Sequence, residues 1–213
     1  MKVDWIEGQG FDSNIFLIKN DKIVLVDAGT GLNSKRVDQK FREFGIKPEE
    51  IDILVNTHCH VDHSGGDSNI LEASNCELMT SKPAAEALRT ADGEATLGRR
   101  FGLKIEPLEV SRVLEEGDEI ELGKSTLKIL STPGHSNGSI SLYEPREKAL
   151  FSGDVVFRGG IGRTDFPTSD PRAMKKSLQK LSKLDVEKLY PGHGPIAEED
   201  AKKHLEFALN FFG

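Results

Sequence analysis

Hydrophobic positions along the chain form two kinds of segment. Short runs that are apolar throughout, or at every second position, predict β-strands. Apolar residues three or four positions apart predict helices, and Asn33 is a suitable cap for the first of them. The predicted strands are Ser13–Lys19, Lys22–Asp27, Ile51–Asn56, Cys76–Thr80, Ser111–Leu114, Glu119–Leu122, Ser125–Leu130, Ser139–Tyr143, Ala149–Ser152 and Glu187–Tyr190. The predicted helices run from Asn33 to about Phe44, over Asp67–Ala73, from Pro83 onwards, from Pro171 to about Leu184 and from about Glu198 to Phe211.

The order of these elements predicts an α/β fold. Strands and helices are interspersed, and several neighbouring strands are joined by short turns, which indicates two sheets with helices outside. Residues 91–106 have no clean period and carry Arg99, Arg100 and Lys104, so we expect a loop or lid there. No linker-like segment interrupts the pattern, and we therefore expect one domain over residues 1–213.

Charge and composition narrow the classes of partner. The net charge of −7 repels phosphate backbones, so nucleic acid is not an expected partner. No apolar run approaches the roughly 20 residues that span a bilayer, and the N-terminus has no apolar signal region. The two cysteines, Cys59 and Cys76, do not form a disulfide framework. We expect a cytoplasmic protein with a small-molecule partner and no membrane contact, and the sequence makes no prediction of oligomeric state.

A dense cluster of ligand-type residues follows the predicted strand Ile51–Asn56. It places His58, His60, Asp62 and His63 within six residues. Imidazole and carboxylate are common metal ligands, and so many polar groups do not pack into a core. In an extended segment residues 58, 60 and 62 point one way and His63 points elsewhere, so the cluster could serve two metals rather than one.

Three further junctions at predicted strand ends carry a ligand-type residue next to glycine. They hold His135, Asp154 and His193. Glycine lets the backbone turn sharply beside a ligand. The alternative is a set of solvated polar loops, but five of the six histidines fall in the first cluster or at these further Gly-rich junctions, which favours a metal site. The sixth, His204, has no such surroundings and is expected to be an ordinary helix residue.

The HxHxDH motif, followed by Gly-His, Gly-Asp and Gly-His, resembles the metallo-β-lactamase superfamily over residues 13 to about 197. The resemblance implies a four-layer αββα sandwich of two mixed sheets with outer helices, with metals at the loop-bearing edge. It also implies a ligand set for each of two divalent ions, zinc foremost, with iron and manganese as alternatives. The implied sets are His58, His60 and His135 for the first metal, Asp62, His63 and His193 for the second, and Asp154 as the bridge.

The segment from Gly153 to Pro167 resembles the glyoxalase-II-like group and the related persulfide dioxygenases rather than antibiotic-cleaving lactamases. Typical glyoxalase II enzymes have a longer helical C-terminal region that helps to bind glutathione. This chain ends at Gly213, so it resembles the shorter members of the group. The sequence Gly-His-Ser-Asn-Gly-Ser around His135 departs from the usual Gly-His-Thr-Pro-Gly.

The leading hypothesis is therefore hydrolysis of a thioester or a related acyl compound, as in hydroxyacylglutathione hydrolases. A metal pair lowers the pKa of water, and Asp62 aims the resulting hydroxide. One alternative is a mononuclear non-haem iron persulfide dioxygenase with His58, His135 and Asp154 as the facial triad. Another is a non-enzymatic scaffold, although a scaffold is expected to have lost ligands.

Other residues carry weaker hypotheses. Arg99, Arg100 and Arg163 are candidate contacts for an anionic substrate group. The simpler interpretations are a solvated loop for the first two and, for Arg163, a structural ion pair with Asp165 or near Asp154. Cys59 is expected to be a small buried residue, because alternation turns it away from its neighbouring ligands. The Gly-rich segment that begins at Asp27 lacks a following phosphate-binding signature, so we do not expect nucleotide binding.

Overall fold

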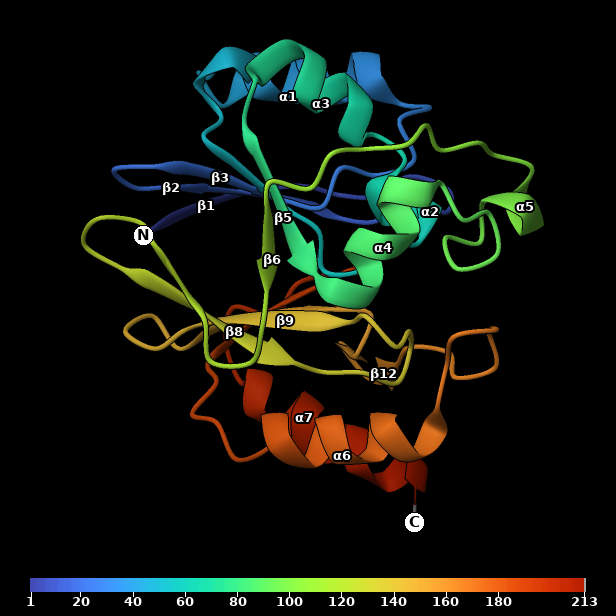
Figure 1. The fold of residues 1–213 in the computed structure, drawn as a ribbon. Coiled ribbons are helices and arrows are strands. Elements are labelled where there is room, and N and C mark those ends of the chain that lie inside the picture. The colour runs from blue at the N-terminus through green and yellow to red at the C-terminus, as the bar shows by residue number, and fades with distance from the viewer. Residues whose placement is uncertain (213) are drawn as a thin grey trace.

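Two mixed β-sheets lie face to face, and helices cover the outer face of each sheet (Figure 1). The computed structural model describes residues 1–212. This arrangement confirms the predicted four-layer αββα sandwich. The first sheet contains, in spatial order, β1 (Lys2–Ile6), β2 (Ile15–Lys19), β3 (Ile23–Val26), β4 (Ile53–Val55), β5 (Glu77–Ser81) and β6 (Arg112–Leu114). The second contains β13 (Lys188–Pro191), β10 (Ala149–Gly153), β9 (Ile140–Glu144), β8 (Thr126–Ser131) and β7 (Glu119–Glu121).

The first sheet changes from antiparallel to parallel pairing at β3. Strands β1, β2 and β3 are antiparallel, whereas β3 to β6 run parallel to one another. The central parallel strands are covered on both faces, which explains why Ile53–Val55 is apolar at every position. Strand β1 is absent from the predicted elements. It is a short, half-exposed edge strand, and its pairing with β2 rather than a strong apolar pattern holds it in place.

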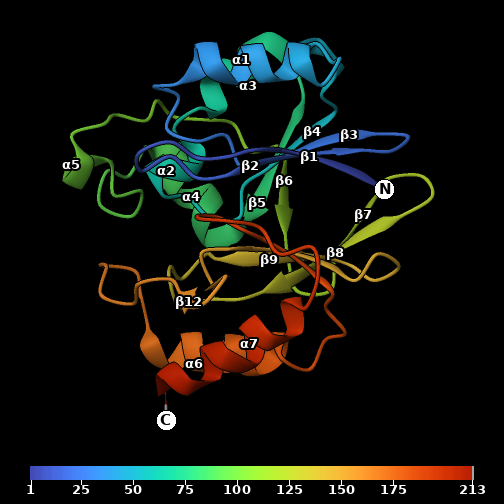
Figure 2. The same cartoon turned by 180° about the vertical axis from the view of Figure 1, so that it is seen from behind.

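The helices divide between the two outer faces. Helices α1 (Ser34–Glu43), α3 (Asp67–Ser74) and α4 (Lys82–Thr90) pack on the first sheet. Helices α6 (Pro171–Leu181) and α7 (Ala201–Leu209) lie side by side on the second, as Figure 2 shows from behind. No helix within residues 1–212 combines the length and the apolarity needed to cross a bilayer. The remaining short elements are the 3-10 helices Pro48–Glu50 and Asn210–Phe212, α2 (Val61–Ser64), α5 (Gly98–Phe101), β11 (Val156–Phe157) and β12 (Gly160–Ile161).

A trio of aromatic rings in the core between the sheets fixes the strands that lead to the candidate site. The ring centroids of Phe16, Phe151 and Tyr190 lie 4.8 to 5.5 Å apart. These residues belong to β2, β10 and β13, and Asp154 and His193 each follow three positions after one of the rings. Because all three rings are buried, packing here sets where both ligand-type side chains emerge.

Candidate metal centre

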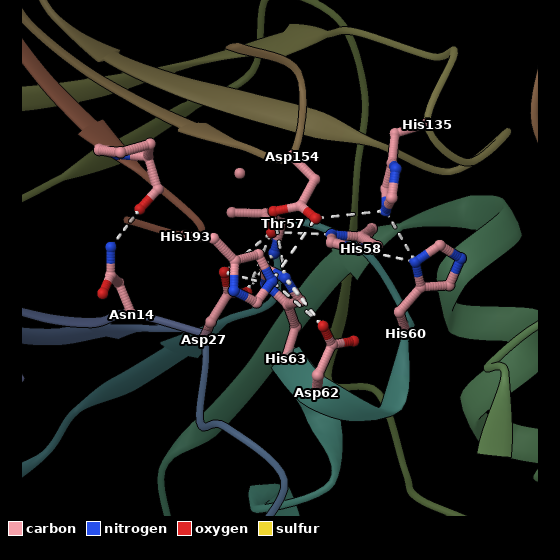
Figure 3. Close-up of polar contacts among 12 residues, drawn as sticks. Asn14, Asp27, Thr57, His58, His60, Asp62, His63, His135, Asp154 and His193 are labelled. Carbon is pink, nitrogen blue, oxygen red and sulfur yellow. Dashed lines mark hydrogen bonds and ion pairs between the residues drawn. The ribbon is translucent and has the colours of Figure 1, made fainter. Parts of the chain in front are cut away.

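The seven predicted ligand residues come together at one end of the two sheets, and Figure 3 shows their side chains pointing toward one another. They come from loops that follow four strands and from the short helix α2. His58 and His60 follow β4, Asp62 and His63 lie on α2, His135 follows β8, Asp154 follows β10 and His193 follows β13.

The backbone between the first four ligands differs from the prediction in one respect. The extended segment ends at His60, and helix α2 begins at Val61, so the alternation does not continue to Asp62. Asp62 and His63 instead lie on one helical turn and both reach the second ligand set. Glycine at position 66 lets this turn pack closely, since a Cβ there would lie 2.2 Å from the carbonyl oxygen of Ala28.

Three imidazole nitrogens form the first ligand set. Nδ1 of His60 lies 3.0 Å from Nε2 of His58 and 2.9 Å from Nε2 of His135. These separations are close to the distance of about 3.4 Å between ligands of a tetrahedral metal with 2.1 Å bonds. Burial and the neighbouring imidazoles hold the pKa of His58 well below its usual value, and burial and His135 lower the pKa of His60 to about 3. The rings of His58 and His60 are therefore neutral, which is the form that binds metal.

Hydrogen bonds on the far side of two of these rings, those of His135 and His58, fix their tautomers. Nδ1–H of His135 donates to the carbonyl oxygen of Arg163 at 2.9 Å, which leaves the lone pair of Nε2 facing the other histidines. Nδ1 of His58 lies 3.1 Å from the hydroxyl of Thr57, which in turn donates to the carboxylate of Asp27. Such outer contacts orient metal-binding histidines and raise their basicity.

The second ligand set consists of Asp62, His63 and His193. Nε2 of His193 lies 3.1 Å from Oδ2 of Asp62, and Nε2 of His63 lies 3.9 Å from the same oxygen. Burial opposes protonation of His63, but the carboxylates of Asp154, Asp27 and Asp62 outweigh it and raise its pKa well above the usual value. A divalent cation placed among these groups would replace the proton as the balancing positive charge.

Asp154 lies between the two sets. Its Oδ1 is 3.3 Å from Nε2 of His63, and its Oδ2 is 3.4 Å from Nε2 of His135. Within residues 1–212, both Oδ1 of Asp154 and Nε2 of His63 are buried without a hydrogen-bond partner. Buried polar atoms are normally paired, so these two atoms have the geometry and the unused bonding capacity for a metal ion. Glycine is required at position 192, where a Cβ would lie 2.2 Å from Oδ1 of Asp154.

Asp27 is a residue of the site that its sequence context did not reveal. It adopts a left-handed backbone conformation with φ of 60°, which turns its carboxylate toward the ligands. Oδ2 accepts a hydrogen bond from Nδ1 of His63 at 2.8 Å, and the carboxylate also binds the Thr57 hydroxyl that contacts His58. One carboxylate therefore orients a histidine of each ligand set. The available signal was an aspartate at the end of a buried strand.

Replacing Asp27 by asparagine is expected to lower the affinity for divalent metal by about 10- to 100-fold, because a neutral amide orients His63 less strongly. Competition with a chromophoric chelator measures this affinity directly. Asp38→Asn, at an exposed position on α1, is the matched control and is expected to bind metal as the parent does. Unchanged affinity in Asp27→Asn would show that the carboxylate has no orienting role.

Asn14 is a second residue that the sequence analysis did not single out. Its side-chain amide donates to the carbonyl oxygens of Pro191 at 2.9 Å and Gly194 at 2.8 Å. Figure 3 shows Asn14 beside the ligand cluster, on the side of His193. These carbonyl groups lie on either side of His193 in the sequence. The two hydrogen bonds from the buried amide therefore hold the loop that carries this ligand in place. The signal in the sequence was a polar residue immediately before the apolar strand β2.

The cluster opens into a pocket of about 360 Å³. Arg163 lines this pocket, but its guanidinium is exposed and pairs with Asp165 at 2.7 Å, as the ion-pair interpretation expected. Arg99 and Arg100 line an adjoining groove that shares Leu97 with the pocket. The structure thus brings all three arginines to the rim and none into direct contact with the ligand cluster. Cys59 is buried, as expected, and burial raises its pKa to about 12.

A two-sheet sandwich with a buried His/Asp cluster at the ends of its strands is the architecture of a metal-dependent enzyme. A sequence profile of the metallo-beta-lactamase superfamily matches residues 8–193, and the chain belongs to this superfamily. The profile confirms the family resemblance that the ligand motifs indicated. The ligand cluster fits divalent metal ions.

The similarity to individual relatives agrees with this assignment to the superfamily. The chain is 37% identical to a probable metallo-hydrolase of Methanocaldococcus jannaschii, over 96% of this chain and 98% of that one. It is 34% identical to an acyl-coenzyme A thioesterase of Gallus gallus (89% and 76% covered) and 31% identical to a hydroxyacylglutathione hydrolase of Haemophilus influenzae (99% of each). A solved structure of a protein in a di-iron-bound form superposes with a TM-score of 0.79 at 30% identity, covering 96% of both chains. These relatives support a metal-dependent hydrolase.

Proposed function

We propose that this protein hydrolyses thioesters at a site that holds two divalent metal ions, zinc foremost. The observation that carries the proposal is the complete second ligand set beside the first, with Asp154 placed between them. A mononuclear oxygenase needs three ligands and has no evident use for three more. Two of the relatives described above, a coenzyme A thioesterase and a hydroxyacylglutathione hydrolase, use different carriers but both have thioester substrates.

The metal ligands, Asp62 and the arginines at the rim have different roles in the proposed reaction. When bound, the metals would supply a Lewis acid and lower the pKa of a water molecule. Asp62 is partly accessible from the pocket, so its carboxylate is placed to accept a hydrogen bond from the attacking water and orient it. The leaving thiolate needs little proton donation, because an ordinary thiol has a pKa of about 8.5. Arg99, Arg100 and Arg163 at the rim provide positive charge for an anionic carrier.

The experiment that tests this proposal pairs a thiol-release assay with an oxygen electrode. Purified, metal-loaded protein is given several acyl thioesters and, separately, a persulfide. We expect thiol release from thioesters without oxygen uptake, and about two equivalents of metal per chain. Oxygen uptake on the persulfide with no thioester cleaved would overturn the proposal in favour of an iron oxygenase that uses His58, His135 and Asp154.

A further inference from the structure

Two phenylalanines from distant loops form a stacked pair at the mouth of the pocket. Phe11 lies between β1 and β2, and Phe101 lies in α5, yet their ring centroids are 5.2 Å apart with an interplanar angle of 16°. Both rings line the pocket and remain 41% and 42% exposed. Large apolar side chains that gather around a concave site are typical of ligand contacts.

The rest of the pocket separates polar from apolar groups. The metal-ligand residues form one part of the lining, and Arg163 is the other polar side chain among the lining residues that the structure describes. The remaining side chains of the lining are apolar: Phe11, Leu97, Phe101, Phe157, Ile161 and Phe166. A polar substituent on the substrate would therefore lose its water without gaining a side-chain hydrogen bond from the aromatic wall, which is unfavourable.

Two arginine side chains lie near a different aromatic ring of the pocket, that of Phe166. The guanidinium of Arg163 lies 4.6 Å from the ring centroid of Phe166, and that of Arg100 lies 5.6 Å from it. This ring stands edge-on to His60 and His135, at 5.6 Å from each. Arg163 is already paired with Asp165, so these two residues and Arg100 together carry one net positive charge. The rim near Phe166 thus suits an anionic group, whereas the stacked pair Phe11–Phe101 offers apolar surface alone.

From this arrangement we infer that the substrate carries an apolar acyl chain of several carbons, which packs on the Phe11–Phe101 pair while its anionic carrier lies near Phe166. The inference rests on the proposed thioester hydrolysis. It assigns Phe11 and Phe101 as specificity-determining residues, and it makes short 2-hydroxyacyl groups poor substrates.

The test uses one carrier, coenzyme A, with acetyl, butanoyl, hexanoyl, octanoyl and lactoyl groups. For the parent protein kcat/KM is expected to rise by about two- to fourfold for each added methylene. Burial of one methylene group strengthens binding by up to about fourfold. In Phe11→Ala and Phe101→Ala the octanoyl-to-acetyl ratio is expected to fall by about tenfold or more. Phe207→Ala, an exposed ring on α7, is the matched control and should keep the parent ratio.

Binding of the corresponding S-alkyl thioethers, measured by calorimetry, separates this inference from the proposed function, because thioethers cannot be hydrolysed. Affinity that rises with chain length in the parent and rises less steeply in Phe101→Ala supports the inference even if no thioester is cleaved. Cleavage with no dependence on chain length, or with lactoyl preferred, overturns it and leaves thioester hydrolysis standing. Equal chain-length dependence in the parent and in both pocket variants would also overturn it.

Discussion

Asp62→Asn is expected to reduce thioester hydrolysis by about 10²- to 10⁴-fold while the protein remains folded, which is the range for losing a positioned proton acceptor. Asp62 lies in the pocket with Oδ2 3.1 Å from Nε2 of His193, so the carboxylate belongs both to the second ligand set and to the surface that meets the attacking water. Asparagine keeps the size of the side chain, but it lacks the charge and presents a single acceptor oxygen.

Three measurements separate the roles of this carboxylate. Metal content and the melting curve show whether the variant is loaded and folded, and kcat shows whether orientation is lost. If metal content is maintained by excess metal, kcat should still fall while KM changes little, because the lost interaction matters most in the transition state. Asp38→Asn serves again as the matched control. Near-parental turnover in a fully loaded Asp62→Asn protein would show that this residue does not orient the nucleophile.

The metal cluster was predictable because most of its residues are histidines, which are scarce in this chain, and because they recur in one local context. His135, Asp154 and His193 each directly follow a glycine where a predicted strand ends. Carboxyl ends of neighbouring strands meet at one edge of a sheet, so local pattern alone placed these side chains near each other. Histidine is also rare in this chain, and five of its six copies lie either in the cluster at 58–63 or at the junctions of His135 and His193.

Other parts of the site depend on contacts that no local pattern records. Helix α2 is four residues long, too short to show a helical period, so the local pattern predicts an extended segment between His60 and Asp62. Asp27 resembles an ordinary turn aspartate until the fold brings His63 within 2.8 Å of it. The pair of Phe11 and Phe101 joins two aperiodic segments far apart in the chain, and its stacking follows from tertiary structure alone.

Asp154→Asn is expected to remove most of the stabilisation that metal gives to this protein. Both oxygens of Asp154 face ligand nitrogens of different sets, at 3.3 Å from His63 and 3.4 Å from His135, so both metals would lose a charged ligand. A ligand present at about 1,000 times its Kd stabilises a folded protein by about 4 kcal/mol. For a chain of this length that corresponds to a rise in Tm of about 8 to 16 °C.

The readout is the difference in Tm between metal-loaded and EDTA-treated protein, measured for each variant separately. This difference cancels any effect of the substitution on the stability of the metal-free protein. Such an effect is expected, because Asp154 is buried beside His63 and stabilises the protonated form of its imidazole. We expect a difference of about 8 to 16 °C in the parent protein and in Asp38→Asn, and less than about a third of it in Asp154→Asn. Elemental analysis should then find less than one equivalent of metal in Asp154→Asn. A full Tm difference with two equivalents of metal retained would exclude Asp154 as the bridge, because neither set would have depended on its carboxylate.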